Sequence, residues 1–315
     1  MITIENFIIS INVVLPLFLT ISLGYFFKQV KLFDDHTLKV MNNLTFKSFL
    51  PILIFFNIYN ADLSLGIDFK LIIFAVISII SIFLVMTLIV PMIEKDDKRK
   101  GVLVQAIFRS NFVLFGLPIA ISLFGEEKAG STSMLIACII PTFNFLAVIS
   151  LEMYRGLKID VKKILKGIIT NPLILGSAFG LLMLGTGIKL PLVLEKTIGD
   201  LAKVATPLAL VVLGGSFKFN AVKDGMKQLI FGVVGRLIIV PAIFIPISIF
   251  LGFRDVELIT LLVMFSAPGA VSSFTMAQQM DADSELAGEI VVFGSAFAVF
   301  TMFFWIYIVK SFGYI

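Results

Sequence analysis

Ten apolar runs, each long enough to cross a membrane, constrain the fold of this chain more than any other feature. They fall at residues 7–27, 40–59, 70–93, 101–124, 131–153, 165–186, 199–216, 228–251, 257–279 and 287–310. A helix that spans the hydrocarbon core of a bilayer needs about 20 apolar residues. Only 15% of the 315 residues are charged, whereas soluble domains carry about 25%. The runs therefore predict an all-α integral membrane protein with ten transmembrane helices.

The prolines repeat across the middle of the chain. Pro16 and Pro51 recur in the second half as Pro172 and Pro207, and the two pairs have the same spacing along the sequence. Pro91 and Pro118 recur as Pro241 and Pro268, both shifted by a second, slightly shorter interval. A single small difference in spacing accounts for the two intervals. The repetition predicts a duplicated unit, with a first five-helix repeat at 1–155 and a second at 156–315.

Lysine and arginine orient the ten predicted helices. With the N-terminus outside, the inner connections hold 15 of these residues, Lys158 and Lys223 among them, and the outer connections with the C-terminus hold seven. Cytoplasmic loops carry the excess of positive charge, so both termini are expected outside. An odd number of helices in each half then turns the second repeat upside down, which predicts an inverted repeat. The first seven residues contain no Lys or Arg, so no cleavable signal is expected.

Several classes of function are disfavoured by composition. The chain has one cysteine, Cys138, and one histidine, His36, which leaves no pair for a disulfide and no His/Cys metal cluster. A Cys/His nucleophile pair is missing for the same reason, so we expect neither an enzyme nor a bound cofactor or metal. The net charge of +4 sits in short loops and reflects topology, so no nucleic-acid partner is expected.

The fourth and ninth runs carry the residues with the clearest chemistry. Pro118 follows Gly116 in the fourth run, and Gly269 follows Pro268 in the ninth. Proline and glycine interrupt a helix, and open backbone groups at membrane depth survive only beside protein, water or ligand. We expect the two breaks to meet, with half-helix N-termini presented to an anion. The flanking polar candidates are Ser110, Asn111, Ser272 and Ser273, with Asn111 as the leading ligand. The alternatives are a simple proline kink and an interhelical hydrogen bond by Asn111.

Other polar residues lie within apolar runs. Asn144 follows Pro141 in the fifth run, and Asn43 and Lys47 precede Pro51 in the second. Lys47 either attracts an anion or extends to the inner face of the membrane. For the deep Arg109 and Arg236 we favour structural pairing with backbone carbonyls or Glu289. No Asp or Glu falls at the centre of a run, so a central carboxylate relay for protons has no candidate.

In these motifs the chain resembles the auxin efflux carrier family, which includes plant auxin exporters and bacterial malate and malonate permeases. The matching stretches are Asn43 with Phe49-Leu-Pro51, Ser110-Asn-Phe-Val-Leu-Phe-Gly-Leu-Pro118, Asn171-Pro172, Pro207-Leu-Ala-Leu-Val-Val-Leu-Gly214, Arg236-Leu-Ile-Ile-Val-Pro241 and Ala267-Pro-Gly-Ala-Val-Ser-Ser273. The long hydrophilic loop of many plant members is missing, so the chain looks like a prokaryotic member. Ser272-Ser273 departs from the plant pattern.

The resemblance implies the fold of bile-acid sodium symporters and NhaA-type antiporters. Helices 1, 2, 6 and 7 would form a scaffold, often dimeric, so a homodimer is possible. Helices 3–5 and 8–10 would form a transport domain that moves like an elevator, with helices 4 and 9 crossing at the substrate site. Asn111 would hold the substrate carboxylate, Pro118 and Pro268 would mark the crossover, and Asn43 and Lys47 would lie on the scaffold side of the pathway.

The sequence therefore predicts a secondary transporter of small organic anions such as carboxylates. The physical basis is two half-helix ends at a polar crossing with no buried acid to repel an anion. One alternative is sodium-coupled symport, and another is a receptor or regulatory scaffold that binds a ligand without transport. The coupling ion stays open. A prokaryotic member is expected to be a multi-pass protein of the bacterial cytoplasmic membrane, surrounded by the lipid bilayer.

Overall fold

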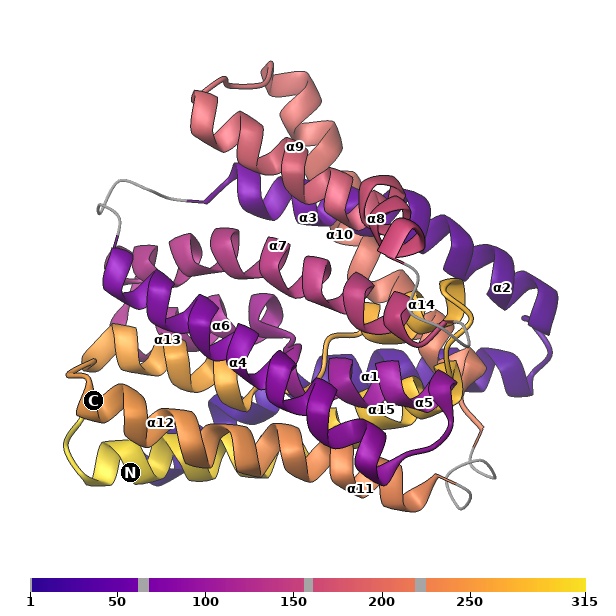
Figure 1. Cartoon of the computed structure of the whole chain (residues 1–315). Helices are drawn as coiled ribbons and strands as arrows, with labels where there is room; N and C mark the ends of the chain where they lie inside the picture. The colour runs from indigo at the N-terminus through magenta and orange to yellow at the C-terminus, as the bar shows by residue number, and fades with distance from the viewer. Residues whose placement is uncertain (1, 62–67, 156–160, 219–224) are drawn as a thin grey trace.

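The computed structural model describes residues 2–61, 68–155, 161–218 and 225–315, and the described residues are helical, with no β-strand. The helices are α1 (Ile2–Gln29), α2 (Asp35–Leu44), α3 (Leu50–Tyr59), α4 (Phe69–Ile93), α5 (Asp97–Phe108), α6 (Phe112–Phe124), α7 (Gly130–Met153), α8 (Val161–Thr170), α9 (Pro172–Thr186), α10 (Leu192–Ser216), α11 (Met226–Val234), α12 (Val240–Phe250), α13 (Asp255–Ser266), α14 (Ser272–Gln279) and α15 (Ser284–Ser311) (Figure 1). Short π-helical turns, η1 (Thr45–Phe49) and η4 (Gly235–Ile239), join α2 to α3 and α11 to α12.

Each predicted apolar run coincides with one helix or with consecutive helices. By length and apolar composition, six helical stretches among the described residues can cross a membrane. A seventh is the pair α8 and α9, which is bent by 56°. Large apolar side chains such as Leu88, Met92 and Phe250 are exposed on the outer surface, where a bilayer would cover them. The all-α, multi-pass membrane architecture is therefore confirmed.

Acidic or amide side chains start many of the helices. Asp34, Asp68, Asp96, Asn171 and Asp283 each accept a hydrogen bond from a backbone N–H in the first turn. These side chains satisfy donors that the helix itself leaves without a partner. The polar connections between the apolar runs thus fix where the chain turns back.

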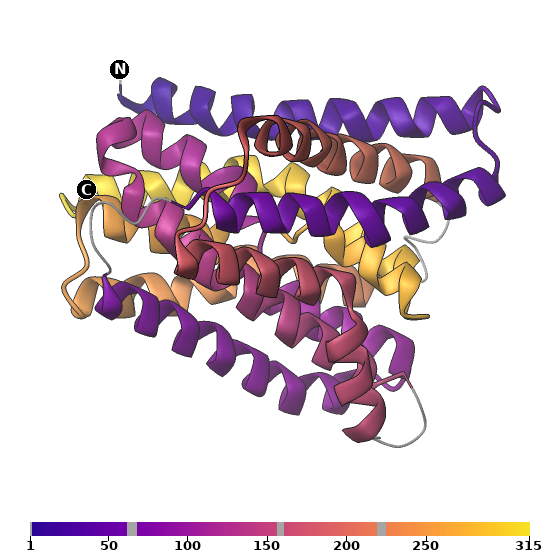
Figure 2. The ribbon, with the colours of Figure 1, turned by 90° about the horizontal axis from the view of Figure 1, so that it is seen from above.

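Both termini lie at the same end of the molecule in both views (Figures 1 and 2). The connection between α1 and α2 lies at the opposite end. An even number of passes through the molecule follows from this placement. Lys158 and Lys223 of the charge count, and the start of the second repeat at residue 156, lie outside the described residues.

For two pairs of matching stretches, the helix bounds in the two halves are related by the same shift. The stretch from α2 to α3 (35–59) matches helix α10 (192–216), because its first and last positions are shifted equally. Helix α4 (69–93) matches the stretch from α11 to α12 (226–250) by the same shift. The interval from Pro91 to Pro241 is shorter than this shift. These two prolines therefore do not occupy matching positions in the two helices.

Two helix pairs pack with their backbones in contact. A Cβ atom built on Gly24 of α1 would lie 2.1 Å from the carbonyl oxygen of Val211 in α10, and one built on Gly214 would lie 1.9 Å from that of Ile21. Helices α9 and α3 meet in the same manner at Gly176, where a Cβ would lie 2.6 Å from the carbonyl oxygen of Pro51. Small residues at such contacts allow close helix packing in membranes.

Glu94 joins the end of α4 to α11, and we expect it to make stability depend on pH. Burial by itself would raise the pKa of Glu94, but the N–H groups of Asp96 and Lys95 and the amide of Gln228 hold it below the ordinary value of 4.5. A lowered pKa adds stability above the unfolded pKa, which is lost as pH falls through the folded pKa. Thermal unfolding should therefore show Glu94→Gln less stable than wild type at pH 7. The gap should close in acid, and a gap that widens in acid would contradict this.

Candidate functional site

Two helices are interrupted, and their interruptions touch. Helix α5 ends at Phe108 because Arg109 is extended (φ −88°, ψ 124°), and α6 begins at Phe112. Helix α13 ends at Ser266 because Ala267 is extended (φ −64°, ψ 146°), and α14 begins at Ser272. The N–H of Asn111 donates to the carbonyl oxygen of Pro268 at 2.8 Å. The predicted meeting of two helix breaks is therefore present.

The position of the first break differs from the prediction. Pro118 lies inside α6, with an exposed side chain, and Gly116 lies under the ring of Phe112, where a Cβ would be 2.7 Å away. The expectation that Gly116 and Pro118 mark the break is wrong. Helices α5 and α13 have 12 residues each, so Ser110 matches Pro268 in position, because each is the second residue after its helix ends. Proline removes one hydrogen bond from a helix, and a membrane helix tolerates that loss when neighbouring groups satisfy the freed carbonyl.

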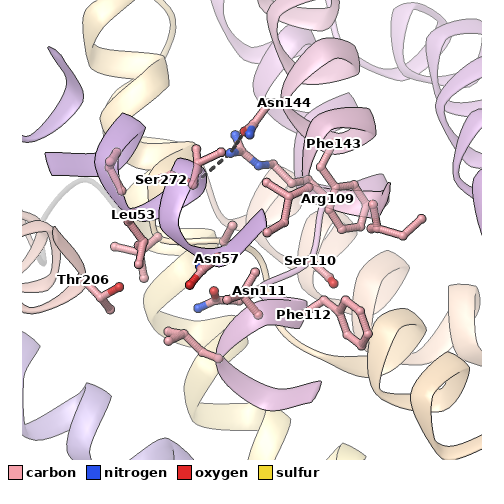
Figure 3. Close-up of a pocket in the computed structure, with 18 of the residues that line it drawn as sticks. Leu53, Asn57, Arg109, Ser110, Asn111, Phe112, Phe143, Asn144, Thr206 and Ser272 are labelled. Atoms are coloured by element: carbon pink, nitrogen blue, oxygen red, sulfur yellow. Dashed lines mark hydrogen bonds between the residues drawn. The ribbon is translucent and has the colours of Figure 1, made fainter. Parts of the chain in front are cut away.

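A cavity of about 190 Å³ lies beside the crossing. Five parts of the chain line it: α3, the break and first turn of α6, α7, α10, and residues 270–272. The lining residues are Leu50, Leu53, Ile54, Asn57, Arg109, Ser110, Asn111, Phe112, Val113, Leu114, Ile139, Ile140, Phe143, Asn144, Thr206, Ala209, Ala270, Val271 and Ser272. Most of these side chains are apolar, and the polar ones gather around the break (Figure 3).

Two polar groups at the break lack a partner. Asn111 and Ser110 are both buried, and neither the amide nitrogen Nδ2 of Asn111 nor the hydroxyl of Ser110 has a hydrogen-bond partner within the described part of the chain. Buried polar groups are nearly always paired, and an unpaired one costs free energy. Both residues line the cavity, so a ligand with acceptor oxygens would satisfy these two groups once their side chains turn toward it.

Arg109 places a buried positive charge in the cavity wall. Its Nη1 donates to Oε1 of Gln105 at 2.9 Å and to the sulfur of Met276 at 2.7 Å. Its Nη2 donates to Oδ1 of Asn144 at 2.7 Å and to Oγ of Ser272 at 2.8 Å (Figure 3). These partners are all neutral side chains, so the expected pairing of Arg109 with backbone carbonyls or Glu289 is wrong. These hydrogen bonds fix the orientation of the guanidinium, but none of their acceptors carries a negative charge that would neutralise it.

Arg236 follows the expectation for a structural arginine. Its guanidinium is buried, and within the described ranges its acceptors are all backbone carbonyl oxygens, those of Ile107, Phe108, Met264 and Ala267. It does not line the cavity. The two deep arginines therefore have different surroundings, with Arg109 at the cavity and Arg236 behind it.

Some of the other residues predicted from the sequence line the cavity, and others do not. Asn144 and Ser272 line the cavity and hold Arg109. Pro268 and Gly269 lie in the second break, and Ser273 follows it, but these three do not line the cavity.

Asn43 and Lys47 are exposed and do not line this cavity either. The neighbouring Asn42 is the buried residue of this segment, and its Nδ2 donates to the carbonyl oxygen of Thr275 at 3.4 Å. On the helical stretch 35–59, Asn42 turns toward α14 while Asn43 and Lys47 turn outward.

Two lining residues were not among the sequence candidates. Asn57 projects from α3 and Thr206 from α10, and both face the same space as Asn111 (Figure 3). Asn57 lies in the apolar run that follows Pro51, and Thr206 directly precedes Pro207. A polar residue within a membrane run was the available signal, but many polar residues in this chain share it.

The electrostatics of the cavity favour an anion. The first turn of α6 and the start of α14 both line it, and a helix N-terminus carries a partial positive charge of about +0.5. Arg109 adds a full positive charge. No cluster of three or more His, Cys, Asp or Glu side chains placed to share a metal ion occurs among the described residues. An arrangement of this kind can hold negative charge beside an apolar surface.

Known proteins similar to this chain point to transport. An uncharacterized transporter of Methanocaldococcus jannaschii is 25% identical over 306 residues, which cover 94% of this chain and 98% of the relative. An uncharacterized transporter of Methanothermobacter thermautotrophicus is 25% identical over 313 residues, which cover 94% and 97%. The membrane transport protein family, which is the auxin efflux carrier family, matches residues 9–306. Because this match extends over nearly the whole chain, the protein is a membrane transporter of the auxin efflux carrier family.

Proposed function

We propose that the protein is a secondary transporter of small organic anions, with carboxylates as the substrate class. The observation that carries this proposal is the buried guanidinium of Arg109, which lines the cavity and whose hydrogen-bond partners among the described residues are all neutral. An uncompensated buried charge costs several kcal/mol. A bound anion would offset that cost. The free energy of the buried charge is therefore lower in the loaded site than in the empty site.

The free donors at the break suit a carboxylate in particular. An ionised carboxylate only accepts hydrogen bonds, and Asn111 Nδ2 and the Ser110 hydroxyl have donors to give. The volume of about 190 Å³ is below the roughly 300–1,000 Å³ of pockets for drug-sized ligands. We therefore infer a small substrate whose carboxylate meets the break and whose apolar part meets residues such as Leu53, Ile140 and Phe143.

The placement of the cavity supports an elevator-like step. Its walls come from α3 and α10 on one side and from the break of α5 and α6, with α7 and α14, on the other. The first group belongs to the proposed scaffold and the second to the proposed transport domain. A substrate held by Asn111 and Arg109 would travel with the transport domain as that domain slides past α3 and α10.

The packing pattern supports an inverted ten-helix repeat. Helix α1 packs along α10, and the matching pair, α9 and α3, packs in the same way. Helix α4 packs against α5 in the first half, and α12 packs against α13 as the matching pair in the second half. Together with the equal shift of two pairs of matching stretches, 35–59 with 192–216 and 69–93 with 226–250, this pattern favours a duplicated unit. We propose both termini outside, in the cytoplasmic membrane of a prokaryotic cell, and a possible homodimer through the scaffold.

Flux measurements test this function. Purified protein in proteoliposomes should take up labelled malate, malonate, lactate or indole-3-acetate with saturation, and it should not take up neutral analogues. Arg109→Gln should lower the rate about 10- to 100-fold, because a hydrogen bond to a charged group contributes roughly 1.5–3 kcal/mol.

The matched control for Arg109→Gln is Lys203→Gln, which removes an exposed cation from α10, paired at the surface with Asp200. We expect uptake at the wild-type rate for this control. If no anion is taken up under any gradient, the transport proposal for organic anions fails. If Arg109→Gln and Lys203→Gln both behave as wild type, the anion site lies elsewhere.

A further inference from the structure

The guanidinium of Arg236 lies where both half-helices end. Its Nε donates to the carbonyl oxygen of Ala267 at 2.8 Å, and its Nη2 donates to that of Met264. Its Nη1 reaches the carbonyl oxygens of Ile107 at 3.1 Å and Phe108 at 3.4 Å. The side chain is only 2% exposed. One cation therefore joins the C-terminal ends of α5 and α13, which are far apart in the sequence.

The charges at this junction balance. The last carbonyls of a helix carry a partial negative charge of about −0.5, so the two half-helix ends together supply about −1. Arg236 supplies +1, and its hydrogen-bond acceptors in the described part of the chain are backbone carbonyls. The π-helical turn η4, Gly235–Ile239, carries Arg236 and presents it to both ends at once.

Four carbonyl oxygens around one positive charge are also the chemistry of a coupling-ion site. In carriers with discontinuous helices, unwound carbonyls and half-helix C-termini coordinate the sodium ion or proton that drives transport. Here a cation that is part of the chain already occupies that environment. A mobile cation would be repelled by the guanidinium and would find these carbonyls engaged.

We propose that Arg236 is a built-in counter-cation that takes the place of a coupling metal cation at the crossing. Anion transport by this protein then needs neither sodium nor potassium. The proposal rests on the function proposed above, because it concerns what accompanies the anion. It also explains the division of charge at the crossing: Arg236 neutralises the negative helix ends, while the positive N-terminal ends and Arg109 are left for the substrate.

Thermal unfolding tests the role of Arg236 without any flux. Wild-type protein in detergent should have the same Tm in sodium, potassium and choline chloride at equal ionic strength. Arg236→Gln should have a lower Tm, which low millimolar guanidinium should raise. Urea at the same concentration should not raise it, because urea has a similar shape and no charge. Arg236→Lys should lie between Arg236→Gln and wild type, since it keeps the charge and loses the forked geometry.

Arg254→Gln is the matched control. Arg254 also donates to backbone carbonyls, those of Ile249 and Phe253, but it lies at the exposed end of α12. Guanidinium should leave the Tm of Arg254→Gln unchanged. Recovery of both variants by guanidinium, or of Arg236→Gln by urea, would show that the effect is not a charge site and would overturn the proposal.

The flux arm uses wild-type protein in proteoliposomes. Replacing sodium or potassium by choline should leave the initial rate of carboxylate uptake unchanged. A rate that requires sodium, or a Tm that sodium raises, overturns the proposal even if the Arg236 variants do not fold. Absence of carboxylate uptake in every cation, with the unfolding results as expected, would support the counter-cation and instead reject the proposed function.

Discussion

Asn111→Asp is expected to lose nearly all anion uptake while the fold is retained. The side chain keeps its size, and the backbone N–H that donates to Pro268 is unaffected. The new carboxylate would lie in the cavity with the guanidinium of Arg109 and the first turn of α6, where it would occupy the place of the substrate anion. Like charges placed together cost several kcal/mol, which corresponds to a loss of roughly 100-fold or more.

Two measurements separate loss of transport from loss of folding. Uptake of labelled carboxylate into proteoliposomes should fall to background for Asn111→Asp, and its Tm should stay at or above that of wild type, because the new carboxylate would lie at the positive N-terminal end of α6, in the same cavity as the Arg109 guanidinium. Asn60→Asp is the control, since Asn60 is exposed at the end of α3 and outside the cavity. Substantial uptake by Asn111→Asp would mean that the anion does not bind at this break.

Gly214→Ala is expected to produce the largest loss of stability among single-methyl changes. The new Cβ would lie 1.9 Å from the carbonyl oxygen of Ile21, which is a backbone atom and cannot rotate away. Helices α1 and α10 would have to separate along their length. Overpacking of a well-packed contact typically costs about 1–3 kcal/mol and occasionally more, and a backbone clash of this size belongs at the upper end.

Gly185→Ala is the matched control for this experiment. Gly185 also lies inside a helix, α9, but apart from the local helix backbone no atom of the described residues lies within 4 Å of a Cβ built on it. Replacing glycine by alanine in a helix should then stabilise by roughly 0.5–1 kcal/mol. Thermal unfolding of the two purified variants should move Tm in opposite directions. Equal Tm values would show that α1 and α10 are not in backbone contact.

The apolar runs were enough to predict the helices, because the determining interaction is local. In lipid every backbone N–H and C=O group must find its partner within the segment, so a run of apolar residues becomes a helix whatever it later packs against. The described helices follow the predicted runs for this reason. The membrane class and the family also followed from the sequence, as did the meeting of two helix breaks, although the first break was expected at Gly116 and Pro118.

The exact break was not predictable from local rules. Pro118 has the residue type that signals an interruption, yet α6 continues through it. The chain instead opens at Arg109, whose partners Asn144 and Ser272 lie 35 and 163 residues away. A helix is interrupted where the hydrogen bonds to other segments outweigh the helical hydrogen bonds that are lost. That balance depends on neighbours from distant parts of the sequence.

The sequence by itself determined that the chain forms apolar helices, where they lie along the chain, and that an uncommon concentration of polar groups occurs in two of them. Only the tertiary structure decided which polar groups converge. It separated Arg109 from Arg236, brought Asn57 and Thr206 to the cavity, and left Lys47 exposed. The physical reason is that helix formation satisfies backbone groups within one segment, whereas a buried charge is satisfied only by groups that folding brings from other segments.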